Sequence, residues 1–466
     1  MAVLTSQGVE FEITVPVVII GAGACGMTAA LTVADAGIEV VVLERESVPQ
    51  GSTALSSGMI PACGTNIQKA LGSEDNVEAM VADILSKAHN ETDANMVKIL
   101  CQESGPAINW LTATHGVELI LVEGFLYPGH SYLRMHAPAS RTGADLIGSM
   151  TQAIERAGVD VLTDSTVTDL FVDPTGCVSG IQFIRPDRTI ETLGCSTLIL
   201  ACNGFGGNPD MVKRLIPDMA DANYFGHTGN QGEAILWGEA LGAATGDLGS
   251  YQGHGSVAHP HGILISWALM MRGGIQVNIN GHRFSNEHQG YSEQGRRVIA
   301  QPESIAWNIF DARLYKMGHD FEDFRQAVSA GAIIKADGLS ELANKCDLSE
   351  DNLLATMNAV SELASGKGMD IFGRDFKTNP QLEPPYFAVK VTGSLFHTQG
   401  GLLVDANAQV LRPDGSLLPN IFAGGGASRG VSGPSDWGYL SGNGLLSAVS
   451  LGRIAGRSAI SFYLEL

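Results

Sequence analysis

The first apolar run of the chain, Pro16–Ile20, ends at a glycine, and two further elements follow it closely. Residues 26–36 carry small side chains at helical spacing, and residues 38–43 form a second apolar run. Short uninterrupted apolar runs are typical of strands that are buried on both faces of a parallel sheet. The pattern therefore predicts a strand–helix–strand unit, a common opening of nucleotide-binding domains.

Helical and strand patterns alternate up to about residue 208. The predicted elements are helices within 76–115 and over 144–157, and strands near 159–163, 167–172, 178–184 and Thr197–Ala201, the last running into a glycine-rich turn at Asn203–Asn208. This alternation again favours an α/β domain.

The chain changes character between residues 251 and 399, where short strand-like runs, a helix over 351–366 and a proline-rich stretch occur. Buried-strand composition returns at Gly400–Asp405 and Ile421–Gly424, and a helix is predicted from about Gly444 to Tyr463. We therefore expect a nucleotide-binding domain built from residues 1–250 and 400–466, with an α+β cap domain, 251–399, inserted between them. Ligand clefts are common at such domain interfaces, so the active site is expected there.

The net charge of the chain argues against some classes of binding partner. The 466 residues include 28 basic and 49 acidic side chains, for a net charge of −21. A nucleic-acid or anionic-membrane ligand needs a basic face, so neither is expected as a partner. No run of about 18 uninterrupted apolar residues occurs and the first residues lack a signal-peptide pattern, so no membrane span is expected.

The cysteines point to a reducing compartment. Their number is odd and they form no CxxC pair or Cys/His cluster, which argues against a disulfide framework, an Fe–S cluster, a haem attachment or a zinc site. A cytoplasmic location is therefore expected. The seven are Cys25, Cys63, Cys101, Cys177, Cys195, Cys202 and Cys346.

The first candidate for chemistry is a GxGxxG turn between the predicted strand and helix. Gly21 would make the tight turn, Gly23 would let a pyrophosphate approach, and Gly26 would let helix and strand pack closely. The free N–H groups of the helix N-terminus suit phosphates. Glu44, at the end of the second strand, would accept hydrogen bonds from a ribose, although it could instead be a plain surface acid.

The spacing of further glycine-rich segments indicates which dinucleotide binds. One follows a strand at Leu200–Gly207, and another, Ile421–Gly426, lies about 400 residues after the first turn. Such a distribution is typical of FAD-binding two-dinucleotide folds, in which the chain returns late to complete the flavin site. No second strand–helix–strand unit for NAD(P)H is evident, so FAD is expected to be the only dinucleotide.

At this point the chain resembles the flavoprotein superfamily of soluble fumarate reductases and 3-ketosteroid dehydrogenases, over almost its whole length. The resemblance rests on Gly51–Met59, Gly281–Glu287, Phe396–Gly401 and Ala423–Gly444. It implies a two-dinucleotide-binding, Rossmann-like FAD domain with a catalytic cap. Covalent relatives anchor the flavin through a His near the first segment, where this chain has Ser52, so non-covalent FAD is expected.

The GxGxxG reading and the resemblance together imply a set of cofactor-binding residues. They are Gly21, Gly23, Ala24, Gly26, Glu44, Arg45, Ser52, Thr53, Ser57, Gly58, Met59, Ala201, Gly204, Gly425, Gly442, Asn443 and Leu445.

Two tyrosines stand where the fumarate reductases carry arginines. Tyr291 follows the GxRFxNE segment by four residues, at the place of their proton-donating Arg. Tyr439 precedes the C-terminal Ser-Gly-Asn at the place of their carboxylate-clamping Arg. Ketosteroid dehydrogenases use a Tyr from the cap and a C-terminal Tyr. The branch that desaturates the 4,5-bond also has a Ser two residues after the second Tyr, and here that residue is Ser441.

The exchange of Arg for Tyr favours a ketone over a dicarboxylate. Arg presents paired donors that match a carboxylate and keeps its proton, whereas Tyr has one hydroxyl of pKa about 10. Removal of a proton beside a ketone needs a base and donors at the enolate oxygen. The resemblance implies Tyr291 as proton acceptor and Tyr439, helped by Ser441, as carbonyl donor. The two tyrosines could exchange roles, or simply pack at a domain interface.

Other candidates are less specific. His397 matches a substrate-binding His of the fumarate reductases and could bind a substrate oxygen or hold the flavin loop, while the looser match of His254 favours a structural role. Tyr127 or Tyr132 falls roughly where the steroid enzymes bring a helper Tyr. Four arginines could bind a carboxylate if the ketone is also an acid, namely Arg134, Arg141, Arg272 and Arg429.

We expect an FAD-dependent oxidoreductase that desaturates a 3-ketosteroid or a smaller cyclic ketone next to its carbonyl, passing electrons to an external acceptor. The alternative is a fumarate-reductase-like enzyme that reduces an enoate or dicarboxylate. A flavoprotein fold kept only to bind partners, a hydroxylase and an amine oxidase remain as other readings.

Overall fold

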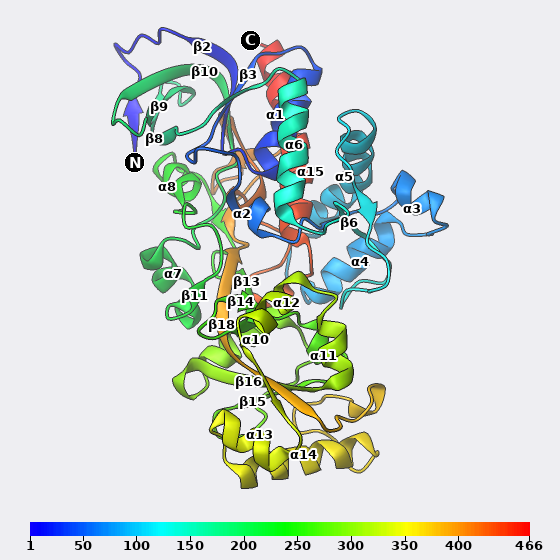
Figure 1. The fold of residues 1–466 in the computed structure, drawn as a ribbon. Coiled ribbons are helices and arrows are strands. Elements are labelled where there is room, and N and C mark those ends of the chain that lie inside the picture. The colour runs from blue at the N-terminus through cyan, green and yellow to red at the C-terminus, as the bar shows by residue number, and fades with distance from the viewer. The chain divides into compact units, whose positions relative to one another are not determined.

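The computed structural model describes residues 1–466, which form two compact units. Unit 1 comprises Met1–Ile216, Gly226–Tyr251 and His397–Leu466, and unit 2 comprises Pro217–Phe225 and Gln252–Phe396. Each unit has its own sheet and its own core (Figure 1). The chain thus has the mixed α/β architecture expected, with one unit built from both chain ends.

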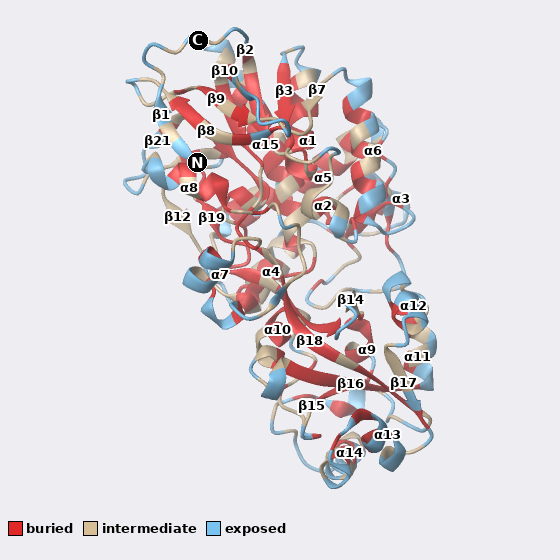
Figure 2. Cartoon of the chain, turned by 60° about the vertical axis from the view of Figure 1, so that its left-hand side comes forward, coloured by how far each residue is buried: buried red, intermediate tan, exposed pale blue.

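A nine-stranded sheet forms the centre of unit 1. Parallel pairs join β2 to β3 and β10, and β10 to β21, so these strands end at one edge of the sheet. Nearly every residue of β2 and β3 is buried, as expected for strands covered on both faces (Figure 2). The strands of this sheet are β1 Ala2–Thr5, β2 Thr14–Ile20, β3 Val40–Leu43, β7 Asp160–Leu162, β8 Thr166–Val172, β9 Val178–Ile184, β10 Ile190–Leu200, β20 Gln409–Leu411 and β21 Leu417–Ala423.

Helix α1 fits against this sheet because its side chains are small. All ten residues from Ala24 to Val33 are buried, and the helix lies beside α6 and α15 (Figure 1). The helices of unit 1 are α1 Ala24–Asp35, α2 Gly51–Leu55, α3 Asn66–Ala70, α4 Val77–Lys87, α5 Ala94–Ala113, α6 Gly143–Arg156, α7 Pro209–Leu215, α8 Glu233–Ala240 and α15 Asn443–Leu464. Two small sheets complete it, from β4 Ile60–Pro61, β5 Ile120–Leu121 and β6 Met135–Ala137, and from β12 Thr245–Gly246 and β19 Gly401–Leu402.

Unit 2 is a seven-stranded sheet with helices on both faces. Successive residues of β16 alternate between two cores. Trp307 and Ile309 pack in the core on the side of α13 and α14, whereas Ala306 and Phe310 pack in the core formed with α9–α12. Its elements are β11 Asn223–Tyr224, β13 Tyr251–Ala258, β14 Ile263–Leu264, β15 Ile275–Asn278, β16 Ile305–Asp311, β17 Ile333–Ala336, β18 Tyr386–Thr398, α9 Ala268–Met271, α10 Tyr291–Ile299, α11 Ala312–Gly318, α12 Glu322–Ser329, α13 Leu339–Cys346 and α14 Glu350–Ala364.

The unit boundaries differ from the expected domain limits at two places. Residues 217–225 belong to unit 2, because β11 adds to β18 as a parallel neighbour. At the other end, unit 2 stops at Phe396, so the three residues from His397 to Gln399 belong to unit 1. The amino-acid composition marks neither boundary. In particular, a strand of two residues such as β11 is recognised only by the strand with which it pairs.

Some elements also differ from the patterns. The helical stretch 76–115 consists of two helices, α4 and α5, separated by residues 88–93. The strand expected over Gly400–Asp405 is only the two residues of β19, whereas β10 begins at Ile190, earlier than expected. After β19 the pairing continues only as an isolated bridge between Val404 and Val410, a distinction that composition alone cannot make.

A buried charge cluster fixes the GxRFxNE segment within unit 2. Arg283 forms two 2.8 Å contacts with Glu287 and one with Asp370, and Arg374 lies 3.0 Å from Glu287. The ring of Phe376 lies 4.6 Å and 4.4 Å from the two guanidinium carbons. Burial opposes ionisation of Glu287, but the two guanidinium groups hold its pKa below the usual range.

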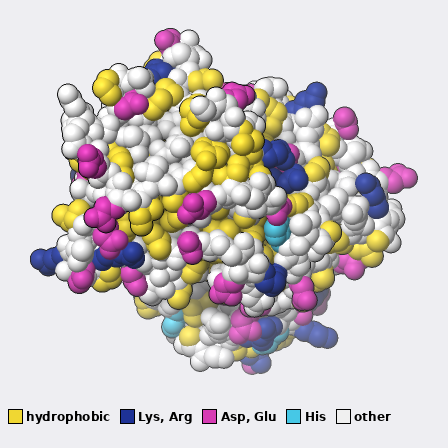
Figure 3. Space-filling view, turned by 90° about the horizontal axis from the view of Figure 1, so that it is seen from above, with side chains coloured by type: hydrophobic (Ala, Val, Ile, Leu, Met, Phe, Trp, Pro, Cys, Tyr) yellow, Lys and Arg dark blue, Asp and Glu magenta, His cyan; other side chains and the backbone are white.

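No helix is both long and apolar enough to span a bilayer. On the face seen in Figure 3, Lys and Arg side chains stand in small groups among Asp and Glu side chains rather than forming one broad basic area.

Loss of the Glu287 charge is expected to destabilise unit 2. In Glu287→Gln the Arg374 and Arg283 guanidinium groups lose their shared anion inside the protein, and removing one member of a buried pair costs about 3–5 kcal/mol. Urea unfolding followed by tryptophan fluorescence should show a lower midpoint. The matched control is Glu322→Gln, which removes an exposed carboxylate and should leave the midpoint unchanged. Equal midpoints for both variants would contradict the role of the cluster.

Candidate functional site

The glycine-rich turn of unit 1 has the geometry that a pyrophosphate needs. Strand β2 ends at Ile20 and α1 begins at Ala24, with Gly23, which has no side chain, at its N-cap. A Cβ at Gly26 would lie 1.9 Å from the Gly21 carbonyl oxygen, so only glycine permits this packing. The backbone N–H groups at the start of a helix such as α1 suit an anionic ligand.

Two side chains brace this turn from neighbouring elements. Glu44 accepts a hydrogen bond from the Ala22 N–H at 2.9 Å and another from the Glu46 N–H at 3.1 Å. Thr53 accepts one from the Ala24 N–H at 3.0 Å. Glu44 is 7% exposed, so it is not a plain surface acid. Each carboxylate oxygen keeps a second lone pair, which can accept from a ribose hydroxyl.

Ser52 is held by two asparagines that the sequence analysis did not identify. Its hydroxyl accepts from the amide groups of Asn203 at 2.8 Å and Asn230 at 2.9 Å. These residues are separated from Ser52 by more than 150 positions, so no local pattern connects them. Asn203 lies within the glycine-rich turn after β10, which was the only available signal.

Arg45 pairs with Glu233, the first residue of α8, through Oε1. The other carboxylate oxygen of Glu233, Oε2, is buried and has no hydrogen-bond partner within the protein. A buried acceptor of this kind requires a donor, and a bound polar ligand can supply it.

The remaining expected cofactor residues occupy several places in unit 1. Ala201 donates its N–H to Ile20, and Gly204 donates its N–H to Asn203. Ser57 is exposed, Gly58 is buried, and the Met59 sulfur accepts from the Tyr127 hydroxyl at 3.0 Å. Gly425 begins a 3₁₀ turn beside Cys25, and Leu445 lies in the first turn of α15.

The N-terminus of α15 is a second helix end in unit 1 with glycine at its N-cap. This residue is Gly442, with φ of 89°. The Asn443 side chain is buried, its Nδ2 donates to Ser432, and its Oδ1 has no partner within the protein. The helix N-terminus and this acceptor together fit the polar edge of a flavin ring, so the residues present suit FAD.

Tyr439 lies directly beside this helix end. It is 7% exposed, and burial raises the pKa of its phenol to about 12, although hydrogen bonds with the backbone of Gly444 and Gly442 oppose the shift. The phenol is therefore protonated at neutral pH. Such a group can donate a hydrogen bond to a carbonyl but is a poor resting base.

His397 and Tyr439 meet edge to face, with ring centroids 5.4 Å apart. Burial lowers the pKa of His397 to about 4, so the imidazole is neutral near pH 7. A Cβ at Gly444 would lie 3.1 Å from His397 Cε1, which means that glycine makes room for the imidazole against α15. His397 and Tyr439 therefore lie together against the start of α15, although 41 positions separate them in the sequence.

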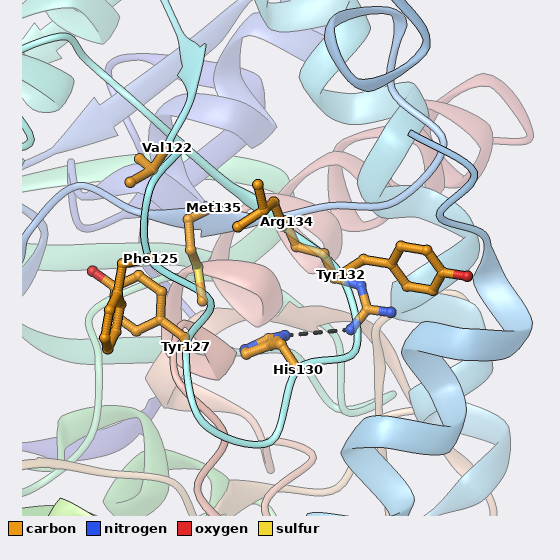
Figure 4. A pocket seen from close by; sticks show the side chains of 8 residues that line it. Val122, Phe125, Tyr127, His130, Tyr132, Arg134 and Met135 are labelled. Atoms are coloured by element: carbon orange, nitrogen blue, oxygen red, sulfur yellow. Dashed lines mark hydrogen bonds between the residues drawn. The ribbon is translucent and has the colours of Figure 1, made fainter. Parts of the chain in front are cut away.

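Loops on two sides hold the segment from Ser432 to Gly442. The rings of Trp437 and His89 stack with centroids 4.3 Å apart. From the other side, His130 Nε2 lies 3.0 Å from the Ser441 carbonyl oxygen, to which it donates. Burial lowers the pKa of His130 to about 4, and its Nδ1 lies 3.4 Å from Arg134, as the dashed line in Figure 4 shows.

Figure 4 separates the two candidate helper tyrosines. Tyr127 packs edge to face on Phe125 and hydrogen-bonds Met59, which places it beside an expected cofactor segment. Tyr132 projects away from that pair, and its ring lies 5.7 Å from the Arg134 guanidinium carbon. Of the two, Tyr127 is therefore the better candidate.

Two of the candidate carboxylate-binding arginines are already paired. Arg134 is buried between Asp75, at 2.8 Å, and Asp83. Arg429 lies 2.8 Å from Asp93. Neither offers an uncommitted guanidinium group to a substrate carboxylate.

Tyr291, in unit 2, is the first residue of α10. Its ring stacks on His254 with centroids 5.0 Å apart, and it packs half-buried against the core that contains Trp267. His254 Nδ1 accepts from the Ser256 N–H at 3.1 Å, and burial lowers the pKa of His254 to about 3. The charge cluster around Glu287 positions this tyrosine by fixing the segment that precedes it.

The sequence matches the family described as FAD binding domain over residues 16–445. A probable fumarate reductase of Shewanella frigidimarina is 29% identical over 97% of this chain and 76% of that protein. A 3-oxosteroid 1-dehydrogenase of Mycobacterium tuberculosis is 28% identical over 90% of this chain and 93% of that protein.

Two solved structures resemble the whole chain. An open flavocytochrome c3 fumarate reductase has a TM-score of 0.83 at 28% identity, covering 98% of this chain and 80% of that one. The 3-ketosteroid Δ4-(5α)-dehydrogenase of Rhodococcus jostii has a TM-score of 0.77 at 24% identity, covering 98% and 99%. The second likeness shows the fold alone.

Replacing Gly26 with alanine is expected to abolish dinucleotide binding. The new methyl group would fall on the Gly21 carbonyl oxygen and open the turn. Purified Gly26→Ala should lack flavin absorbance near 450 nm, to about the level of the buffer, and should not regain it on adding FAD. The control is Gly148→Ala on α6, where a Cβ meets nothing within 4 Å. A yellow Gly26→Ala protein would contradict the assignment.

Stability is expected to fall as the pH is lowered from 6.5 toward 4. Burial lowers the pKa of His130, His136, His288 and His397 to about 4 and that of His254 to about 3. The unfolded chain, with histidine pKa near 6.5, takes up protons that the folded chain excludes in this window. Urea midpoints at pH 7, 6 and 5 should decrease in that order. A constant midpoint would show that these histidines ionise in the folded state.

Proposed function

Because the chain belongs to the FAD-binding family of flavoprotein oxidoreductases that act on CH–CH bonds, we propose that it desaturates a cyclic ketone next to the carbonyl. The substrate class is a 3-ketosteroid or a smaller cyclohexanone-type ketone. The observation that carries the proposal is the buried, protonated Tyr439, which stands where dicarboxylate-binding relatives would need a cation.

Tyr439 and Ser441 are proposed to act on the ketone oxygen. The phenol of Tyr439 remains protonated at neutral pH, so it donates a hydrogen bond to the carbonyl and stabilises the negative charge of the enolate. Ser441, two residues later, adds a hydroxyl to the same segment, which His130 holds through the Ser441 carbonyl. His397, neutral and next to Tyr439, is the third polar group of this cluster.

Tyr291 is proposed as the proton acceptor. In the proposed step its phenol oxygen takes the proton from the α-carbon and the phenol passes its own proton on to water. Bound FAD supplies the two-electron acceptor for hydride from the neighbouring β-carbon. We favour this assignment over the exchanged one because burial raises the pKa of Tyr439 to about 12, which suits a hydrogen-bond donor better than a base.

The cofactor is proposed to be held without a covalent bond. Ser52 stands at the place of the anchoring His of covalent relatives, and its hydroxyl is engaged by two amides. The electrons are proposed to leave to an external acceptor. A cytoplasmic location is part of the proposal, since all seven thiols are free.

The second candidate is reduction of an enoate or dicarboxylate, as the names of the fumarate reductase relatives suggest. Sequence identity favours the two candidates about equally. We favour the ketone because a dicarboxylate calls for guanidinium groups, and two of the four candidate arginines, Arg134 and Arg429, are engaged by aspartates.

An anaerobic titration tests the substrate class. The oxidised, FAD-loaded protein is mixed with ketosteroids, cyclohexanones and succinate while the flavin absorbance is followed. Bleaching by a ketone and not by succinate is expected, since only a ketone oxygen suits the phenol donor. Bleaching by succinate alone would establish the second candidate in place of the first.

Tyr291→Phe tests the proposed base. The variant should stay yellow but bleach about 10²–10⁴ times more slowly with the ketone that bleaches the native protein, as expected for loss of a general base. The matched control is Tyr315→Phe, which removes a hydroxyl from a tyrosine stacked on Phe387 in unit 2. Normal bleaching by Tyr291→Phe would exclude it as the base.

A further inference from the structure

A row of three polar side chains in unit 1 links the start of α15 to His397. Asn443 Nδ2 donates to Ser432 Oγ at 3.1 Å, and Ser432 Oγ donates to Gln399 Oε1 at 2.8 Å. Gln399 Nε2 then lies 3.0 Å from His397 Nδ1. Asn443, Ser432 and Gln399 are 1%, 1% and 5% exposed, so water does not compete for these bonds.

The row has a direction because Ser432 has only one proton. Since its oxygen accepts from the Asn443 amide, its proton is directed to Gln399 Oε1. The NH₂ group of Gln399 is thereby turned toward His397. A neutral imidazole that accepts at Nδ1 carries its proton on Nε2.

The opposite end of the row is open. Asn443 Oδ1 is buried and has no partner in the protein, and Asn443 belongs to the expected cofactor-binding set. A ligand N–H that bonds to this oxygen would hold the amide in the orientation described above. The reverse orientation would turn Gln399 Oε1 toward His397 and favour a proton on Nδ1, which the Thr398 carbonyl, 3.3 Å away, could also accept.

We propose that Gln399, Ser432 and Asn443 are positioning residues that keep His397 in the Nε2–H tautomer, which makes His397 a hydrogen-bond donor to the substrate oxygen. The tautomer rests on the hydrogen bonds alone, and the donation to a ketone oxygen rests also on the proposed function. His397 would then share this task with the Tyr439 phenol, whose ring it touches edge to face. Two donors on one oxygen stabilise an enolate more than one does.

The tautomer can be measured without turnover. In FAD-loaded protein with ¹⁵N-labelled histidine, long-range ¹H–¹⁵N spectra distinguish a protonated from an unprotonated ring nitrogen, and the His397 signals are those lost in His397→Asn. The expected result is a protonated Nε2 and an unprotonated Nδ1. A protonated Nδ1 in the native protein would overturn the proposal.

Gln399→Glu tests whether the Gln399 amide sets the tautomer of His397. A carboxylate in place of the amide cannot donate to Nδ1 and accepts from it, so the His397 signals should change to those of a protonated Nδ1. Ser432→Ala should remove the bias and give mixed signals, while Gln326→Glu, an exposed position on α12, should change nothing. Native-like signals in both Gln399→Glu and Ser432→Ala would overturn the role of the row.

Turnover separates this proposal from the proposed function. With a ketone that bleaches the native protein, Gln399→Glu should lower kcat about 10²-fold and change KM little, as for loss of one oxyanion donor. If no ketone bleaches the native protein but Nε2 is protonated, the proposed function fails and the positioning role stands. If a ketone bleaches the native protein and Gln399→Glu turns that ketone over normally, donation by His397 to the substrate is excluded.

Discussion

The junction between the Ser432–Gly442 segment and helix α15 is the feature on which the rest of the site depends. The N-cap of the helix is Gly442, which has no side chain, and the Tyr439 phenol hydrogen-bonds the backbone of Gly442 and Gly444 at this end. The segment before it cannot shift freely, because Trp437 stacks on His89 and the Ser441 carbonyl is held by His130. The groups that we propose to bind the cofactor and the substrate therefore share one support, which suits the precise placement that catalysis requires.

The parts of the fold that the sequence predicts correctly are those set by residues close together in the chain. Strand β2, the GxGxxG turn and α1 were predicted because spacing, glycine positions and apolar content all agree within 20 residues. The contacts that were missed join residues far apart in the chain. Asn203 and Asn230 at Ser52, Gln399 at His397, and the addition of β11 to β18 are set by tertiary packing, which leaves no periodic signal.

Burial differs between the two tyrosines to which we propose different roles. Sequence resemblance names Tyr291 and Tyr439 as a pair and leaves their roles exchangeable. The enclosed surroundings of Tyr439 raise the pKa of its phenol and favour donation, whereas Tyr291 is half-buried at the start of α10. Where relatives carry arginine, a fixed positive charge would instead favour carboxylates. Under the proposed function, the phenols at these two positions are the reason for expecting a ketone rather than a dicarboxylate.

The most direct test of this account runs the reaction in reverse. The protein is reduced chemically without oxygen, then mixed separately with a cyclic enone such as cyclohexenone or a 4-en-3-one steroid and with fumarate, and return of the oxidised flavin absorbance is timed. We expect an enone to reoxidise the flavin rapidly. Fumarate should reoxidise it no faster than it reoxidises in reduced protein to which no acceptor is added. Rapid reoxidation by fumarate, with enones inert, would contradict this account.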